Sequence, residues 1–108
     1  MADIPHIDVR ELAERRAAGA PLIDVREENE FAEGHAPGAQ LIPLGQVAER
    51  IAEIPTDQTV YVICRSGGRS GKAVEHLRAH GVDAVNVAGG TLAWVEAGQA
   101  VETGGGRS

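Results

Sequence analysis

The chain has 108 residues, of which 43% are apolar, and a formal net charge of −6 with an isoelectric point near 5.1. This size and composition indicate one globular domain with a single core, and the acidic balance argues against a general nucleic-acid binder. The single cysteine excludes an internal disulfide and most metal clusters. Because no apolar run reaches transmembrane length and no secretion signal is visible, we expect a cytoplasmic protein without membrane contact, which suits a free thiol.

Short apolar segments alternate with helical patterns along most of the chain. Strands are expected at residues 4–7, 21–26, 40–43, 59–63 and 84–87. Helices are expected at residues 9–18, 27–33, 44–54, 70–80 and 91–97. Asp8 has capping-box spacing to Glu11, and Pro5 confines the first strand to a sheet edge. The alternation predicts an α/β fold with a mostly parallel sheet.

The chain shows no internal repeat and no second domain. We expect the domain to occupy residues 1–98. Residues 99–108 end in a glycine-rich stretch and are expected to form a flexible tail.

The chemistry of the sequence centres on residues 64–70, CRSGGRS, which we call the Cys64 loop. Cys64 ends an apolar β-type run, and a helical pattern follows the loop. Backbone N–H groups in such a turn form an anion cradle, and Gly67 and Gly68 permit its unusual backbone. The start of the following helix, Arg65 and Arg69 add positive charge. A thiol at the mouth of this cradle is expected to have a lowered pKa and to act as a nucleophile. The alternative is an ordinary buried strand-end cysteine.

Other residues follow strands at the same end of the predicted sheet, where ligands bind in open parallel sheets. Asp24 and Arg26 lie at the carboxyl end of one strand, and Gly89 and Gly90 follow another. Asp24 interrupts an apolar run. It is expected either to orient a loop arginine or cap loop amides, or merely to mark the exposed end of its strand.

Several histidines and one tryptophan invite functional interpretation. His76 and His80 have the i, i+4 spacing of a metal pair, but a solvated helix face is favoured. His35 lies in a turn-rich connector and is expected to be a hydrogen-bonded structural residue rather than a substrate contact. Trp94 is expected to be a packing anchor for the last helix.

These motifs together resemble those of single-domain rhodaneses, which are thiosulfate or persulfide sulfurtransferases. The matching segments span nearly the whole chain in the family's order: residues 22–26 with Glu30 and Phe31, residues 34–39 followed by 42–44, the Cys64 loop, and residues 87–90 with Trp94 and Gly98. Ala36 departs from the pattern, because the family usually carries a larger aliphatic residue there. We interpret this as a change in packing.

The resemblance implies a three-layer α/β/α fold whose five-stranded sheet has the order 1-5-4-2-3. It also implies a two-step reaction without cofactor or metal. Cys64 takes sulfur from a small anionic donor, thiosulfate or a persulfide, and passes it from a persulfide to a thiol or cyanide. The cradle would comprise Arg65, Ser66, Gly67, Gly68, Arg69 and Ser70, with the arginines holding the donor. Asp24, Arg26 and His35 would support the site.

Two other functions remain open at this stage. One is a phosphatase or arsenate reductase. Protein tyrosine phosphatases also place a cysteine before an amide cradle and an arginine, but with five intervening residues. Here only four separate Cys64 from Arg69, which favours a smaller cradle suited to sulfur. Alternatively, the domain would be a sulfur carrier or regulatory module that acts with a sulfur-relay partner protein, since function depends on the site rather than the fold.

Overall fold

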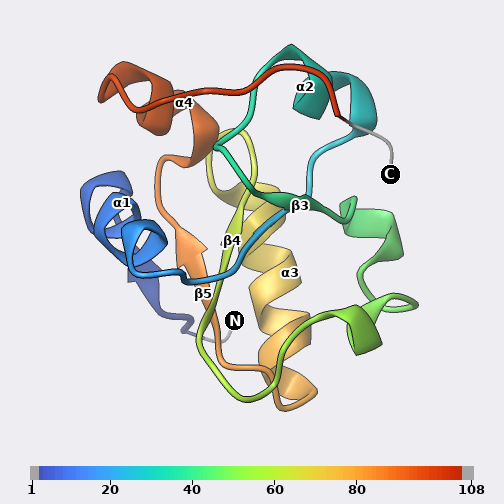
Figure 1. Ribbon diagram of the computed structural model, residues 1–108. Helices are drawn as coiled ribbons and strands as arrows, with labels where there is room; N and C mark the ends of the chain where they lie inside the picture. Colours follow the sequence, from blue (N-terminus) through green and yellow to red (C-terminus); the bar gives the residue numbers. More distant parts are fainter. Residues whose placement is uncertain (1–2, 106–108) are drawn as a thin grey trace.

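The computed structural model describes residues 3–105, in which five strands form one parallel sheet (Figure 1). The strands are β1 (His6–Ile7), β2 (Leu22–Asp24), β3 (Gln40–Leu41), β4 (Val60–Ile63) and β5 (Ala84–Val87). The helices are α1 (Val9–Ala17), α2 (Glu28–Glu33), α3 (Gly68–Ala79) and α4 (Gly90–Glu96). The strand order β1-β5-β4-β2-β3 confirms the predicted order, and β1 lies at an edge as Pro5 requires.

Capping residues fix where the first two helices begin. The Asp8 side chain accepts a hydrogen bond from the Glu11 N–H at 2.9 Å, as the sequence predicts for the start of α1. At α2, Glu30 turns back to accept the Glu27 N–H at 3.0 Å, which is one half of a capping box. The α2 cap therefore holds the Glu30 carboxylate at the start of that helix, where it also binds Arg69 of the Cys64 loop.

The helix expected over residues 44–54 does not form. That segment contains two short 3₁₀ turns instead, η1 (Leu44–Gln46) and η2 (Ile51–Glu53). The apolar residues still face inward, because Val47 and Ile54 are buried while Leu44 and Ile51 pack against the core. The apolar spacing therefore predicted the inward positions of Leu44, Val47 and Ile51, but Ala48, which was expected on the same helical face, is exposed. Short turns satisfy much of the same spacing as a helix.

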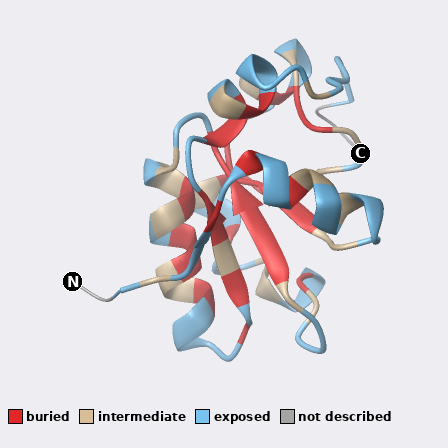
Figure 2. Cartoon of the chain, turned by 90° about the vertical axis from the view of Figure 1, so that its left-hand side faces the viewer, coloured by how far each residue is buried: buried red, intermediate tan, exposed pale blue. Residues whose placement is uncertain are grey.

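Two apolar clusters cover the two faces of the sheet. One joins α3, through Ala73, Val74 and Leu77, to the 3₁₀ segment; the other joins α1, through Leu12, to α4, through Trp94. Figure 2 shows the result: the central strands β2 and β4 are buried, while the outward faces of the helices are exposed. This is the expected three-layer α/β/α arrangement.

The segment after α4 runs back across the molecule toward α2 (Figure 1). The Trp94 Nε1–H donates to the Ala100 carbonyl at 2.8 Å, and His35 and Glu102 form an antiparallel bridge with two hydrogen bonds of 2.9 Å. The flexibility of the expected tail stays a prediction, and its residues 106–108 lie outside the described residues. Between residues 3 and 105, no helix is long and apolar enough to cross a membrane.

Candidate active site

Cys64 lies directly after β4, at the carboxyl end of a central strand, and is 1% exposed. The Cys64 loop then turns into α3, whose N-cap is Gly67. Gly67 has a φ of +115°, a left-handed conformation that side chains rarely adopt. The glycine therefore lets the chain reverse tightly enough to bring the N-terminal end of α3 over the cysteine sulfur.

The sulfur of Cys64 receives hydrogen bonds from the loop that follows it. The Gly67 N–H lies 3.1 Å from Sγ, and the Ser70 hydroxyl lies 3.3 Å from it. Burial raises the pKa of the thiol, but the Ser70 hydroxyl and the backbone N–H groups of Ser70, Gly67 and Ser66 outweigh it, so the pKa is lowered overall. The predicted direction of the shift is confirmed, and the backbone N–H groups of the predicted cradle are among its causes. The Ser70 hydroxyl is an additional cause, and Cys64 and Arg69 also interact through their charges, which contributes to the raised pKa of Arg69.

The two arginines of the loop have different surroundings. Arg69 makes a bidentate ion pair with Glu30, with both N···O distances at 2.8 Å, which raises the pKa of Arg69. The same hydrogen bonds lower the pKa of Glu30 to about 2, although its partial burial opposes this. Arg65 is exposed and, among the described residues, forms no ion pair. Arg65 is thus the loop cation available to an incoming anion, while Arg69 is neutralised by α2.

Asp24 does not mark an exposed strand end, because it is fully buried. Its carboxylate accepts Arg26 Nη2 at 2.8 Å, Arg26 Nε at 3.0 and 3.1 Å, and the Arg26 backbone N–H at 3.1 Å. Arg26 Nη2 also donates to the Gly34 carbonyl at 2.8 Å. The expectation that Asp24 orients an arginine was right in kind, but the partner is Arg26 rather than an arginine of the Cys64 loop. The Asp24–Arg26 ion pair therefore holds Gly34, where the connector of residues 34–39 begins after α2.

His35 is a buried structural residue, as the sequence favoured. Its Nδ1 lies 2.7 Å from the Phe31 carbonyl, and its ring stacks on that of Phe31 with centroids 3.6 Å apart. Nε2 lies 3.6 Å from the Glu102 carboxylate. All of these partners belong to α2 and the C-terminal segment, so His35 is not brought to the Cys64 loop.

The start of α4 forms a second wall of the site. The Thr91 N–H and hydroxyl donate to the Cys64 carbonyl at 2.8 and 3.0 Å, and the Leu92 N–H donates to the Arg65 carbonyl at 3.1 Å. Gly90 packs against the same backbone with a φ of +59°. The predicted convergence of the Cys64 loop with Gly89 and Gly90 is therefore confirmed, with Thr91 as an unforeseen partner.

Replacing Gly90 by alanine should displace the Cys64 loop. A Cβ at Gly90 would lie 2.5 Å from the Arg65 carbonyl oxygen and 2.6 Å from that of Cys64, and neither backbone group moves freely. We expect a loss of stability of about 1–2 kcal/mol from the left-handed backbone and about 1–3 kcal/mol more from the clash. The alkylation rate of Cys64 should fall as well, and thermal unfolding with iodoacetamide kinetics measures both effects.

Gly98→Ala is the matched control for this substitution. Gly98 has a similar φ of +77°, but a Cβ there would meet nothing within 4 Å. It should show the backbone cost alone and leave Cys64 reactivity unchanged. Equal reactivity of the Gly90→Ala and Gly98→Ala variants would contradict the close packing of α4 on the loop.

Three residues that contact the Cys64 loop were not identified as site residues from the sequence: Glu30, Thr91 and Asn86. Glu30 was named only among the residues that carry the family resemblance. Asn86 is a buried polar residue within the apolar strand β5, and that contrast was the available signal. Its side chain contacts Ser70 and Gly67.

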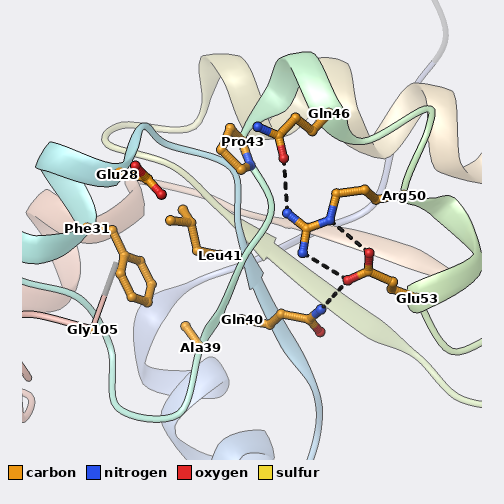
Figure 3. A pocket seen from close by; sticks show the side chains of 10 residues that line it. All are labelled: Glu28, Phe31, Ala39, Gln40, Leu41, Pro43, Gln46, Arg50, Glu53 and Gly105. Atoms are coloured by element: carbon orange, nitrogen blue, oxygen red, sulfur yellow. Dashed lines mark hydrogen bonds and ion pairs between the residues drawn. The ribbon is translucent and has the colours of Figure 1, made fainter. Parts of the chain in front are cut away.

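A separate cavity of about 580 Å³ lies beside β3 and the 3₁₀ segment (Figure 3). Arg50 crosses it and is held by Gln46 at 3.0 Å and by Glu53 at 2.8 and 2.9 Å. None of the residues of the Cys64 loop line this cavity. Among the described residues that line this cavity, Arg50 is the one arginine, and it is already paired. Because the cavity also lacks the cysteine, we do not place the reaction there.

Comparison with known proteins gives a family match over residues 8–97, to the family described as Rhodanese-like domain. A protein of Allochromatium vinosum named "Sulfurtransferase" is 37% identical over 98 residues, covering 88% of this chain and 92% of the relative. The uncharacterized protein YqhL of Bacillus subtilis is 49% identical over 76 residues, covering 69% of this chain and 60% of the relative. The crystal structure of a rhodanese-like domain protein from Staphylococcus aureus is 35% identical, has a TM-score of 0.84, and covers 93% of this chain and 98% of its own.

Proposed function

This chain belongs to the rhodanese-like domain family, and from that premise we propose that it is a sulfurtransferase with Cys64 as its nucleophile. The observation that supports this most directly is the cradle around the sulfur. The Gly67 N–H at 3.1 Å and the Ser70 hydroxyl at 3.3 Å aim hydrogen-bond donors at Sγ and favour its thiolate form.

The proposed reaction has two displacement steps and needs no external oxidant or reductant. The Cys64 thiolate attacks the outer sulfur of thiosulfate, the new S–S bond forms, and sulfite leaves with the electron pair of the broken S–S bond. An acceptor thiolate or cyanide then attacks the outer sulfur of the Cys64 persulfide and releases the Cys64 thiolate. With a persulfide donor, a thiolate takes the place of sulfite as the leaving group.

The residues of this chain have distinct proposed roles in these steps. The Gly67 N–H and the Ser70 hydroxyl stabilise the thiolate and then the persulfide anion, which occupies the same cradle. Arg65, exposed and free of an ion pair within residues 3–105, attracts the anionic end of the donor. Asp24 and Arg26 act indirectly, by fixing the connector that follows α2.

Intact mass spectrometry after incubation with thiosulfate tests this proposal. We expect Cys64 to gain one sulfur atom, and cyanide or a thiol to remove it with release of thiocyanate or a new persulfide. Rapid release would support a free-standing enzyme, whereas loading with slow release would support the sulfur-carrier alternative. Failure of thiosulfate and persulfides to add sulfur, or phosphate release from aryl phosphates instead, would overturn the proposal.

Glu30→Gln should increase the use of thiosulfate. Both Nη atoms of Arg69 are held by Glu30, so the loop offers a dianionic donor less positive charge than its sequence suggests. Glutamine keeps the helix-capping hydrogen bond to Glu27 but removes the charge. We expect kcat/KM for thiosulfate to rise about two- to fivefold at low salt, and the gain to shrink at high salt.

Glu28→Gln is the matched control for this prediction. It removes the same charge from an exposed position on the same helix, but Glu28 forms no ion pair with Arg69. Its kcat/KM for thiosulfate should remain close to that of the wild type. A fall in kcat/KM for Glu30→Gln would show instead that the ion pair holds Arg69 where the donor needs it.

A further inference from the structure

The hydroxyl of Ser70 has two hydrogen-bonding neighbours but only one proton. Ser70 is fully buried, and its Oγ lies 3.3 Å from Cys64 Sγ and 2.5 Å from Asn86 Oδ1. A serine hydroxyl donates one hydrogen bond, so it cannot donate to the sulfur and to the amide oxygen together. The sulfur and Asn86 therefore compete for the same proton.

The orientation of the Asn86 amide follows from its other contacts. Nδ2 lies 3.3 Å from the Gly67 carbonyl oxygen, which can only accept a hydrogen bond. Nδ2 also lies 3.2 Å from His6 Nδ1, which accepts when the His6 proton is on Nε2. A flipped amide would set its oxygen against the Gly67 carbonyl, two acceptors with no proton between them. The oxygen of Asn86 must therefore face Ser70, where it can only accept.

We propose that Asn86 is a positioning residue for Cys64, because its side-chain oxygen holds the Ser70 hydroxyl proton away from the sulfur. In the thiol form, Ser70 donates to Asn86 and presents its lone pairs to the Cys64 S–H. When the thiol loses its proton to solvent, the electron pair stays on sulfur, and the Ser70 hydroxyl rotates to donate to it. Asn86 thus opposes formation of the thiolate. The persulfide anion, which lies in the same cradle, would likewise compete with the Asn86 oxygen for the Ser70 proton.

The placement of Asn86 supports a role at the site rather than in the sheet. It is 3% exposed within β5, whose other residues are Ala84, Val85 and Val87, and asparagine is unfavourable in strands. Two of its three side-chain partners, Ser70 and Gly67, belong to the Cys64 loop. The third is His6 on the neighbouring strand β1.

Alkylation of Cys64 by iodoacetamide over a pH series tests the inference. This measurement needs no sulfur donor, so its result does not depend on the proposed sulfurtransferase activity. Only the inferred effect on the persulfide rests on that proposed function. The Asn86→Leu variant removes the amide oxygen that accepts the Ser70 proton. Of the two competing acceptors, only the Cys64 sulfur then remains for the Ser70 hydroxyl. We expect a lower pKa for Cys64 and an alkylation rate about fivefold higher at pH values below that pKa. Combined with Ser70→Ala, the same Asn86→Leu substitution should no longer change the pH profile.

The isosteric variant Asn86→Asp provides a second test if Asn86→Leu does not fold, which thermal unfolding would reveal. Its carboxylate accepts the Ser70 proton more strongly and adds a negative charge, so the pKa of Cys64 should rise. That rise should be smaller in the Ser70→Ala background, where only the charge acts. Effects of equal size with and without the Ser70 hydroxyl would overturn the inference and leave Asn86 as a brace for the Gly67 carbonyl.

Discussion

Cys64→Ser should abolish sulfur loading from thiosulfate and from persulfides, changing one added sulfur per chain to none. The cradle would remain, because the serine oxygen can accept the Gly67 N–H that now lies 3.1 Å from Sγ. The hydroxyl, however, stays protonated near neutral pH, whereas the Cys64 thiol has a lowered pKa and supplies thiolate. Intact mass after incubation with each donor measures the loss, and the thermal unfolding midpoint of the variant should stay close to that of the wild type.

Alkylated wild-type protein is the control for this experiment. The chain has one cysteine, so iodoacetamide blocks the same atom without changing the sequence. Both preparations should lack the added sulfur and release no thiocyanate. Sulfur retained on Cys64→Ser would mean that another group carries it, and the mechanism proposed for Cys64 would be wrong.

Asp24→Ala should destabilise the protein by about 3–5 kcal/mol, the usual consequence of leaving one buried charge without its partner. Asp24 is fully buried and Arg26 is 5% exposed. Among residues 3–105, the guanidinium would keep only the Gly34 carbonyl as a close acceptor, at 2.8 Å. Urea denaturation at neutral pH measures the change in the free energy of unfolding. A loss below about 1 kcal/mol would contradict the importance of this ion pair.

Two further variants separate the buried pair from charge loss in general. Replacing Asp24 and Arg26 together by leucine should cost far less than Asp24→Ala, because no unpaired charge remains. Arg78→Ala breaks the exposed pair with Asp83, whose N···O distance is 3.3 Å, and should cost less than about 1 kcal/mol. If the double variant is as unstable as Asp24→Ala, the loss of stability comes from changed packing at this position rather than from an unpaired charge.

The amino-acid sequence by itself indicated the α/β class with a mostly parallel sheet and the position of the cysteine, whereas the order of the strands was expected only from the resemblance to rhodaneses. Strand and helix periodicities are local, and the single Cys64 with its glycines is contiguous in the chain, so no long-range information was needed to find it. Pro5 placed β1 at an edge, and the structure confirms both that placement and the order of all five strands. The direction of the Cys64 pKa shift also followed from the loop alone.

Side-chain partners distant in the chain were decided only by the tertiary structure. Glu30 meets Arg69 across 39 positions and Asn86 meets Ser70 across 16, and no local pattern specifies such pairs. Likewise, apolar spacing over residues 44–54 fits a helix as well as the two 3₁₀ turns that form there. Hydrogen-bond donors and acceptors are directional, so which group holds Arg69, and which shares the Ser70 proton, depends on where folding places the elements that carry them.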